Sequence, residues 1–217
     1  MSISKKEKDK AIIKKIIEIN KKGKPVVIGN MSVSKKEKNN ISHIVRKEQD
    51  ILPKMFFEKL STLVNGNNFQ WYFNKSNLDS TRPPFIKNEN FMFTHMFFND
   101  KGTSSGWFDT FEPILYFIND KVKVNELLRM KLNLYTNQNK KVMYGTHCDL
   151  HDDKGKPFKD VNVAILNFTT CNGGTKIGNK IYKSKANELL IFNNTIKHAG
   201  IVQTDTQTRI ILNINWR

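Results

Sequence analysis

The 217-residue sequence predicts a mainly β domain with flanking helices, whose core is a jelly roll of the double-stranded β-helix type. Short apolar runs alternate with polar turns from residue 131 onward, so that about seven strands fit into roughly 85 residues. No helical pattern separates these runs, which favours a sandwich or barrel. Hydrophobic residues form 38% of the chain and include 15 Phe, which is enough for a sizeable core and excludes wholesale disorder.

The core is expected over about residues 131–217, and α/β elements are expected to precede it. Gly173 and Gly174 predict a tight hairpin between two of its strands. The strands are predicted at Lys131–Tyr135, Val142–Asp149, Val161–Phe168, Lys176–Tyr182, Glu188–Phe192, Ala199–Val202 and Arg209–Trp216.

Mixed patterns fill residues 51–130. Leu52–Val64 has apolar residues at three- and four-residue steps, which predicts a helix. The apolar and aromatic segments Phe69–Phe73 and Phe91–Phe98 predict strands. Phe108–Asn119 and Val122–Met130 are predicted as two helices that precede the sheet. We therefore expect residues 49–217 to form a single domain.

Residues 1–48 are expected to form a lysine-rich helical extension. The first 50 residues hold 14 Lys and Arg against 6 Asp and Glu, and isoleucines gather on one face of a predicted helix at Lys5–Lys22. A solvated helical appendage is the favoured interpretation. A membrane-surface helix, or an arm over residues 1–40 that binds an anionic partner such as nucleic acid or an acidic surface, stays open.

The net charge of +16 does not by itself indicate a nucleic-acid-binding protein. Only five of the 36 basic residues are Arg, whereas base readout and bidentate phosphate contacts favour Arg. No apolar run approaches the roughly 20 residues of a membrane span, and the N-terminus lacks the apolar stretch of a signal peptide. With only two Cys, a cytoplasmic location is expected, in a host cell if the protein is viral. The sequence does not indicate an oligomeric state.

Two histidines and one carboxylate form the candidate metal site. In a strand, residues i and i+2 point to the same side, so His147 and Asp149 would face one spot. His198 opens a later strand and would complete the facial triad that binds non-haem Fe(II) and leaves open positions. A second H-x-D, formed by His151 and Asp153, stays open as an alternative, although its surroundings predict a loop.

Arg209 opens the last predicted strand, which is apolar enough to be buried. A buried guanidinium needs an anionic partner, and its planar shape suits a carboxylate. If the cosubstrate is 2-oxoglutarate, its distal carboxylate would meet Arg209 while its other end chelates the iron. Arg209 paired with a surface acid is the alternative.

These motifs, in this order, resemble the Fe(II)/2-oxoglutarate-dependent dioxygenases. Tyr144, three residues before His147, resembles the Y-x-x-H-x-D of prolyl-4-hydroxylase-like members. Asn133 and Tyr135 resemble the N-x-Y with which alkylation-repair members hold 2-oxoglutarate. The C-terminal part is similar to small phage and marine viral or bacterial oxygenases, and the resemblance covers about residues 69–217.

The resemblance implies Fe(II) held by His147, Asp149 and His198, and 2-oxoglutarate held by Arg209, Tyr135 and Asn133, with no catalytic residue beyond these ligands. It also implies O2 as cosubstrate, hydroxylation of a C–H bond with release of succinate and CO2, and stimulation by ascorbate. Prolyl hydroxylases usually have Lys where Arg209 stands, and alkylation-repair enzymes carry a second Arg about six residues later. The resemblance therefore fixes neither the subfamily nor the choice between hydroxylation and demethylation.

A protein side chain or a small molecule is the expected substrate. Trp107 on a Gly/Ser-rich loop, His151 and Tyr144 are expected to contact it. Three alternatives come from other classes: a nucleic-acid-directed demethylase or hydroxylase that uses the basic N-terminal region, a non-catalytic β-sandwich binding module, and a zinc hydrolase with the same ligands.

Overall fold

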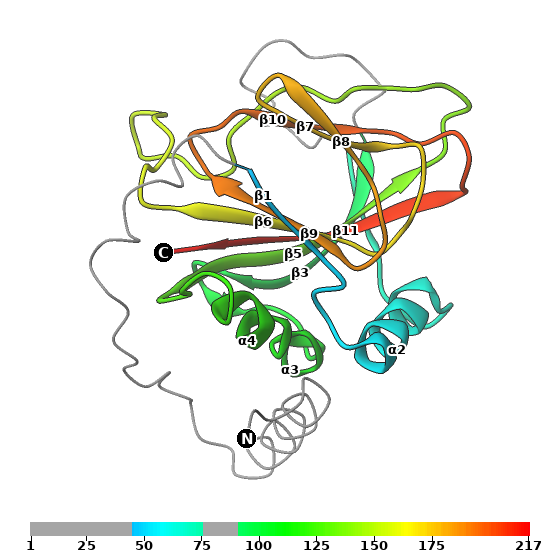
Figure 1. Ribbon diagram of the computed structural model, residues 1–217, viewed down its shortest axis with the longest axis horizontal. Coiled ribbons are helices and arrows are strands. Elements are labelled where there is room, and N and C mark those ends of the chain that lie inside the picture. Colours follow the sequence, from blue (N-terminus) through cyan, green and yellow to red (C-terminus); the bar gives the residue numbers. More distant parts are fainter. Residues whose placement is uncertain (1–44, 76–90) are drawn as a thin grey trace, which may run out of the picture.

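A computed structural model describes residues 45–75 and 91–217 of the protein (Figure 1). The predicted helix at Lys5–Lys22 and nearly all of the lysine-rich extension lie outside the described residues, and the predicted boundary at residue 48 falls within the first strand. In chain order the elements are β1 (Arg46–Gln49), α2 (Lys54–Asn65), β2 (Tyr72–Asn74), β3 (Met92–Asn99), β4 (Gly102–Thr103), α3 (Phe108–Phe111), α4 (Ile114–Asn119), β5 (Leu127–Thr136), β6 (Asn162–Asn167), β7 (Gly174–Ile177), β8 (Lys180–Lys183), β9 (Glu188–Asn193), β10 (His198–Ile201) and β11 (Thr208–Trp216).

Two antiparallel sheets face each other and form the jelly roll. The large sheet has the order β1-β9-β6-β11-β5-β3-β2, with β4 paired to β3, and the small sheet has the order β10-β7-β8. Figure 1 shows the small sheet on one side of the large sheet and helices α2, α3 and α4 on the other. The predicted fold class, a mainly β domain with a double-stranded β-helix core, is confirmed.

Strand β11 separates two environments because its side chains alternate between the faces of the large sheet. Ile210, Leu212, Ile214 and Trp216 are buried in the apolar cluster that includes residues of the helices. The other set lies toward the small sheet and is mostly polar: Arg209, Ile211, Asn213 and Asn215.

Strand β5 repeats this division beside β11. Met130 and Leu132 are fully buried in the cluster on the helical side. The residues that alternate with them face the interior of the jelly roll, and the register places each beside a residue of β11: Arg129 beside Asn215, Lys131 beside Asn213, Asn133 beside Ile211 and Tyr135 beside Arg209. Strands β5 and β11 thus line the interior of the jelly roll with mostly polar side chains, while their opposite faces pack into the apolar cluster on the helical side.

Four local predictions were wrong. Val122–Met130 was expected to be helical, but Leu127 begins β5, because the end of β11 pairs with this segment and β3 joins on the other side from Met130 onward. Val142–Asp149 is not a regular strand and pairs only through isolated bridges. The tight turn lies between β7 and β8 at Gly178, whose φ is +57°, and not at Gly173–Gly174. This turn also divides Lys176–Tyr182, which was predicted as one strand, between β7 and β8.

Among the described residues, no helix has the length and apolar character needed to cross a membrane. Both cysteines are free and buried.

Candidate metal centre and adjoining pocket

The structure brings His147, Asp149 and His198 together inside the jelly roll. His147 and His198 form an antiparallel bridge in which each backbone N–H donates to the other residue's carbonyl, at 2.9 and 2.8 Å. Asp149 Oδ1 lies 3.7 Å from Nε2 of both histidines, and the three potential ligand atoms lie within 4.8 Å of one another. This spacing fits one ion bound by two imidazoles and one carboxylate, with coordination positions left open.

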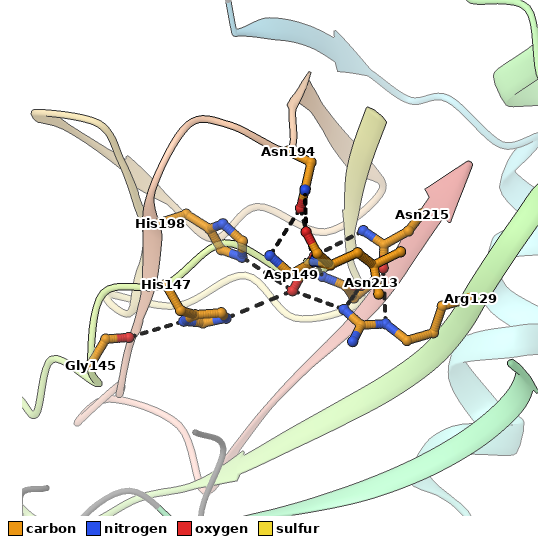
Figure 2. Close-up of polar contacts among 9 residues, drawn as sticks. Arg129, Gly145, His147, Asp149, Asn194, His198, Asn213 and Asn215 are labelled. Carbon is orange, nitrogen blue, oxygen red and sulfur yellow. Dashed lines mark hydrogen bonds and ion pairs between the residues drawn. The ribbon is translucent and has the colours of Figure 1, made fainter. Parts of the chain in front are cut away.

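Both imidazoles are prepared to act as ligands. His147 Nδ1 lies 3.0 Å from the carbonyl oxygen of Gly145, which can only accept, so Nδ1 is the donor and Nε2 is the ring nitrogen that lies near Asp149 (Figure 2). The pKa of His198 is lowered to about 4: burial is the main cause, Asp149 opposes it, and the neighbouring His147 adds to the lowering. His198 is therefore neutral at neutral pH, as metal ligation requires.

The Asp149 carboxylate is held by groups from two strands (Figure 2). Its Oδ2 accepts hydrogen bonds from the side-chain amides of Asn213 and Asn215, both at 2.9 Å, and Arg129 Nη2 lies 2.8 Å from Oδ1. Burial by itself raises the pKa of Asp149, but Arg129 and the two histidines hold it well below its usual range. The carboxylate is therefore ionised, and Oδ1 is the atom directed at the histidines.

Asn194 fixes the backbone that carries Asp149. Its Oδ1 accepts from the backbone N–H of Asp149 at 2.9 Å and of Leu150 at 3.1 Å, while its Nδ2 donates to the Leu150 carbonyl at 2.7 Å. These bonds replace the strand pairing that this irregular segment lacks. The loop geometry around Asp149 is thus set by a buried side chain from the segment after β9.

Four residues that contact Asp149 were not predicted from the sequence: Arg129, Asn194, Asn213 and Asn215. Arg129 had been placed in a predicted helix, where its position beside β11 could not be seen. Asn213 and Asn215 alternate within the last strand, and that spacing is the signal that could have revealed them. Asn215 also stands six residues after Arg209, which is about where alkylation-repair enzymes carry a second Arg.

Arg209 is fully buried, and only part of its guanidinium has a hydrogen-bond partner among the described residues. Its Nη2 donates to Thr175 Oγ1 at 2.9 Å, and its guanidinium lies 5.1 Å from the centre of the Tyr135 ring. Within the described part of the chain, Nε and Nη1 have no hydrogen-bond partner. Burial lowers the pKa of Arg209, but a guanidinium remains charged at neutral pH. Two unpaired donors on a buried cation indicate a place for an anionic group such as a carboxylate.

Tyr135 and Asn133 lie between the Arg209 guanidinium and the group formed by His147, Asp149 and His198, called the metal cluster below. A Cβ on Gly200 would lie 3.1 Å from the Tyr135 hydroxyl oxygen and 3.2 Å from its ring, so Gly200 allows the ring to pack against β10. Asn133 is buried, and its Oδ1 has no partner among the described residues. Both residues line a cavity of about 670 Å³ that also contains the His147–Asp149–His198 cluster and Thr175. One cavity therefore connects the metal cluster to the residues that contact Arg209.

The other predicted residues are more dispersed. His151 lines the same cavity and bridges Pro157, whereas Asp153 is exposed, and the structure does not group these two with a third ligand among the described residues. Trp107 lines a separate hollow and donates from Nε1 to Gln70.

Tyr144 is buried behind Tyr135, with ring centres 5.4 Å apart. Its hydroxyl donates to the backbone carbonyl of Phe91 at 2.5 Å, and its packing supports the wall of the pocket.

Comparisons with known proteins give a structural likeness only. No family model matches the chain, and no curated protein matches it. The chain is similar to an oxidoreductase of the 2OG-Fe(II) oxygenase family from Burkholderia pseudomallei, with a TM-score of 0.57 and 8% identity over 79% of this chain and 84% of that one.

Two further structures are similar. One is the viral collagen prolyl hydroxylase of Paramecium bursaria Chlorella virus-1 in complex with 2OG, with a TM-score of 0.51 and 14% identity over 79% of this chain and 94% of that one. The other is the non-heme α-ketoglutarate-dependent epimerase of nogalamycin biosynthesis, with a TM-score of 0.52 and 10% identity over 80% of this chain and 77% of that one. The chain therefore has the double-stranded β-helix fold of the 2OG-Fe(II) oxygenases, with a His–Asp–His cluster inside the jelly roll.

Proposed function

We propose that the protein is an Fe(II)- and 2-oxoglutarate-dependent dioxygenase that hydroxylates a C–H bond of a protein side chain or a small molecule. The observation that supports this most is the cavity shared by the metal cluster and the residues around Arg209. A metal site explains His147, Asp149 and His198. A second, anionic ligand bound nearby would explain the two donors of Arg209 that have no partner among the described residues.

The donor set fits Fe(II). His147, Asp149 and His198 would hold it through two imidazole nitrogens and one carboxylate oxygen, which is the facial arrangement of non-haem iron sites. When bound, iron and 2-oxoglutarate supply the oxidation of a C–H bond by O2, with succinate and CO2 as products. Ascorbate is proposed as a stimulant of turnover.

The residues around Arg209 would bind and orient 2-oxoglutarate. Arg209 would donate from Nε and Nη1 to the distal carboxylate, with Tyr135 covering one side of the guanidinium and Thr175 fixing Nη2. Because this pocket is fully buried at Arg209, the ion pair would form away from water and would be stronger than at the surface. Asn133 would offer its amide to the same ligand.

The solved structures with this fold include both a hydroxylase and an epimerase, so the fold alone does not choose the reaction. Hydroxylation is proposed because it needs no catalytic residue beyond the metal and cosubstrate ligands.

An anionic partner for residues 1–40, in the cytoplasm, is also proposed. A steep loss of affinity for DNA with salt, abolished by deleting residues 1–40, would support it.

The test is the release of succinate from 2-oxoglutarate by protein purified anaerobically and supplied with Fe(II), Zn(II) or no metal, with and without ascorbate. We expect slow succinate release with Fe(II) and O2, even without substrate, and none with Zn(II). His198→Ala should abolish it, while Lys183→Met, an exposed change on β8, should not. Activity with Zn(II) on an ester or amide, or equal succinate release by His198→Ala, would contradict the proposal.

A further inference from the structure

The inner face of β5 presents a row of polar side chains to the cavity. Arg129, Lys131, Asn133 and Tyr135 all line it, because alternate residues of a strand point to the same side. Both ends of the row are engaged: Arg129 binds Asp149, and Tyr135 packs on the Arg209 guanidinium. Lys131 lies between these ends, and the residues that the structure describes give it no such partner.

Lys131 is a partly buried cation beside the metal cluster. It pairs in register with Asn213, whose side chain donates to Asp149. Within the part of the chain that the structure describes, Lys131 makes no hydrogen bond or ion pair. The pKa of Lys131 is lowered to about 8, chiefly by burial and also by Arg129, while Asp149 opposes both effects, so the amine is still mostly protonated at neutral pH.

The anions already present in the cavity do not neutralise this amine. Asp149 is shared by Arg129, two Asn amides and the two histidines. Asp152, which also lines the cavity, accepts from the backbone N–H groups of Lys154 and Lys156 within its own loop. A desolvated ammonium without an ion-pair partner is destabilising, and the described residues retain this cation without supplying a matching anion.

The proposed cosubstrate does not need this cation either. Its distal carboxylate would bind Arg209, and its other end would bind the metal. Lys131 is therefore a charge beyond what metal and cosubstrate require, placed where a substrate would approach the iron. Lys197, exposed beside His198, adds a second positive group on the opposite wall of the cavity.

We propose that Lys131 Nζ binds an anionic group, a carboxylate or a phosphate, of the primary substrate and so positions that substrate at the metal. A lysine ammonium is a compact point charge that suits either anion without demanding a bidentate geometry. The inference rests on the proposed function, since it assigns a substrate class to the same site. It predicts a substrate whose oxidised carbon lies within a few bonds of its anionic group.

The test uses calorimetry on the full chain with saturating 2-oxoglutarate, which fills the pocket at Arg209. The probes are N-acetyl-L-amino acids, their primary amides and inorganic phosphate, so each acid–amide pair differs only in charge. We expect the carboxylates or phosphate to bind, and Lys131→Met to weaken them by about tenfold while amide binding stays within about twofold. Lys131→Arg should retain most of the binding, and Lys183→Met should match the wild type.

A second titration separates substrate from cosubstrate. The affinity for 2-oxoglutarate, read anaerobically from the visible band of its Fe(II) complex, should not change in Lys131→Met by more than about twofold. If that affinity falls instead, Lys131 serves the cosubstrate and the inference is wrong. It is also wrong if wild-type protein fails to bind acids or phosphate better than amides, or if Lys131→Met keeps the preference. Failure of iron or 2-oxoglutarate to bind at all would overturn the proposed function, whereas calorimetry on the metal-free protein would still decide the role of Lys131.

Discussion

Arg129 Nη2 lies 2.8 Å from Asp149 Oδ1, the same carboxylate oxygen that lies 3.7 Å from both histidines. The guanidinium therefore supplies positive charge at the atom that would bind a metal ion. Arg129 is itself held by Asn215, which accepts from its Nε at 2.9 Å and donates to Asp149 Oδ2 (Figure 2). The ion pair thus keeps the carboxylate ionised and oriented before a metal binds.

Replacing Arg129 by Met should destabilise the metal-free protein. The change leaves a nearly buried carboxylate without its guanidinium, which costs about 3 kcal/mol in comparable buried pairs. Because a divalent ion supplies positive charge at the same oxygen, Fe(II) or Mn(II) should restore part of the loss. Urea unfolding with and without metal measures both effects. If Arg129→Met is as stable as the wild type without metal, the ion pair does not have the role assigned here.

Asn213→Ala and Asn215→Ala should each weaken metal binding. Each amide donates to Asp149 Oδ2, and loss of a group that orients a metal ligand typically costs about 10- to 100-fold in affinity. The affinity should be measured by anaerobic competition with a chromophoric chelator. Asn167→Ala is a matched control, since this buried Asn bonds Glu188 and Ser184 away from the metal cluster. Equal loss in the control would mean that the effect is general destabilisation.

The metal-free protein should lose stability as the pH falls from about 6.5 toward 4. The pKa of His198 is lowered to about 4 in the folded protein, so in this range the unfolded chain binds a proton at His198 that the folded chain does not. The free energy of unfolding should decrease by up to about 1.4 kcal/mol per pH unit from this one group.

His198→Asn should remove that contribution, and bound metal should reduce it. Comparing the pH dependence of urea unfolding in the two proteins isolates the effect of His198, because other titrating groups are shared. Parallel curves for the two proteins would contradict the lowered pKa.

The grouping of His147, Asp149 and His198 and the burial of Arg209 could be predicted from the sequence. The H-x-D spacing indicated the first pair, although the segment that carries it is not the regular strand that was expected. A charged residue that opens an apolar strand indicated the buried cation. The contacts of Arg129 and Lys131 could not be predicted, because they depend on which residue of β11 lies beside each residue of β5. That register is set by packing across the whole sheet, and the same packing made Leu127–Met130 a strand where the local pattern suggested a helix.

Gly200→Ala should weaken 2-oxoglutarate binding and spare the metal site. A Cβ at this position would lie 3.1 Å from the Tyr135 hydroxyl oxygen and 3.2 Å from a ring carbon, so the ring that packs on Arg209 must shift. Displacement of one pocket residue should reduce the 2-oxoglutarate affinity by about tenfold. Titration of the anaerobic Fe(II) protein measures it, with chelator competition for the metal as the control. Unchanged 2-oxoglutarate affinity would show that Tyr135 does not define the pocket.

The central claim is that one cavity binds iron through His147, Asp149 and His198 and 2-oxoglutarate through Arg209. The most direct measurement is anaerobic addition of Fe(II) and then 2-oxoglutarate, followed by visible absorption, for the wild type, Arg209→Met and His198→Ala. The wild type should develop a weak charge-transfer band that saturates with 2-oxoglutarate. Arg209→Met should bind iron normally but need at least about tenfold more 2-oxoglutarate, and His198→Ala should give no band. A wild-type protein that binds iron yet shows no band with 2-oxoglutarate would contradict the account.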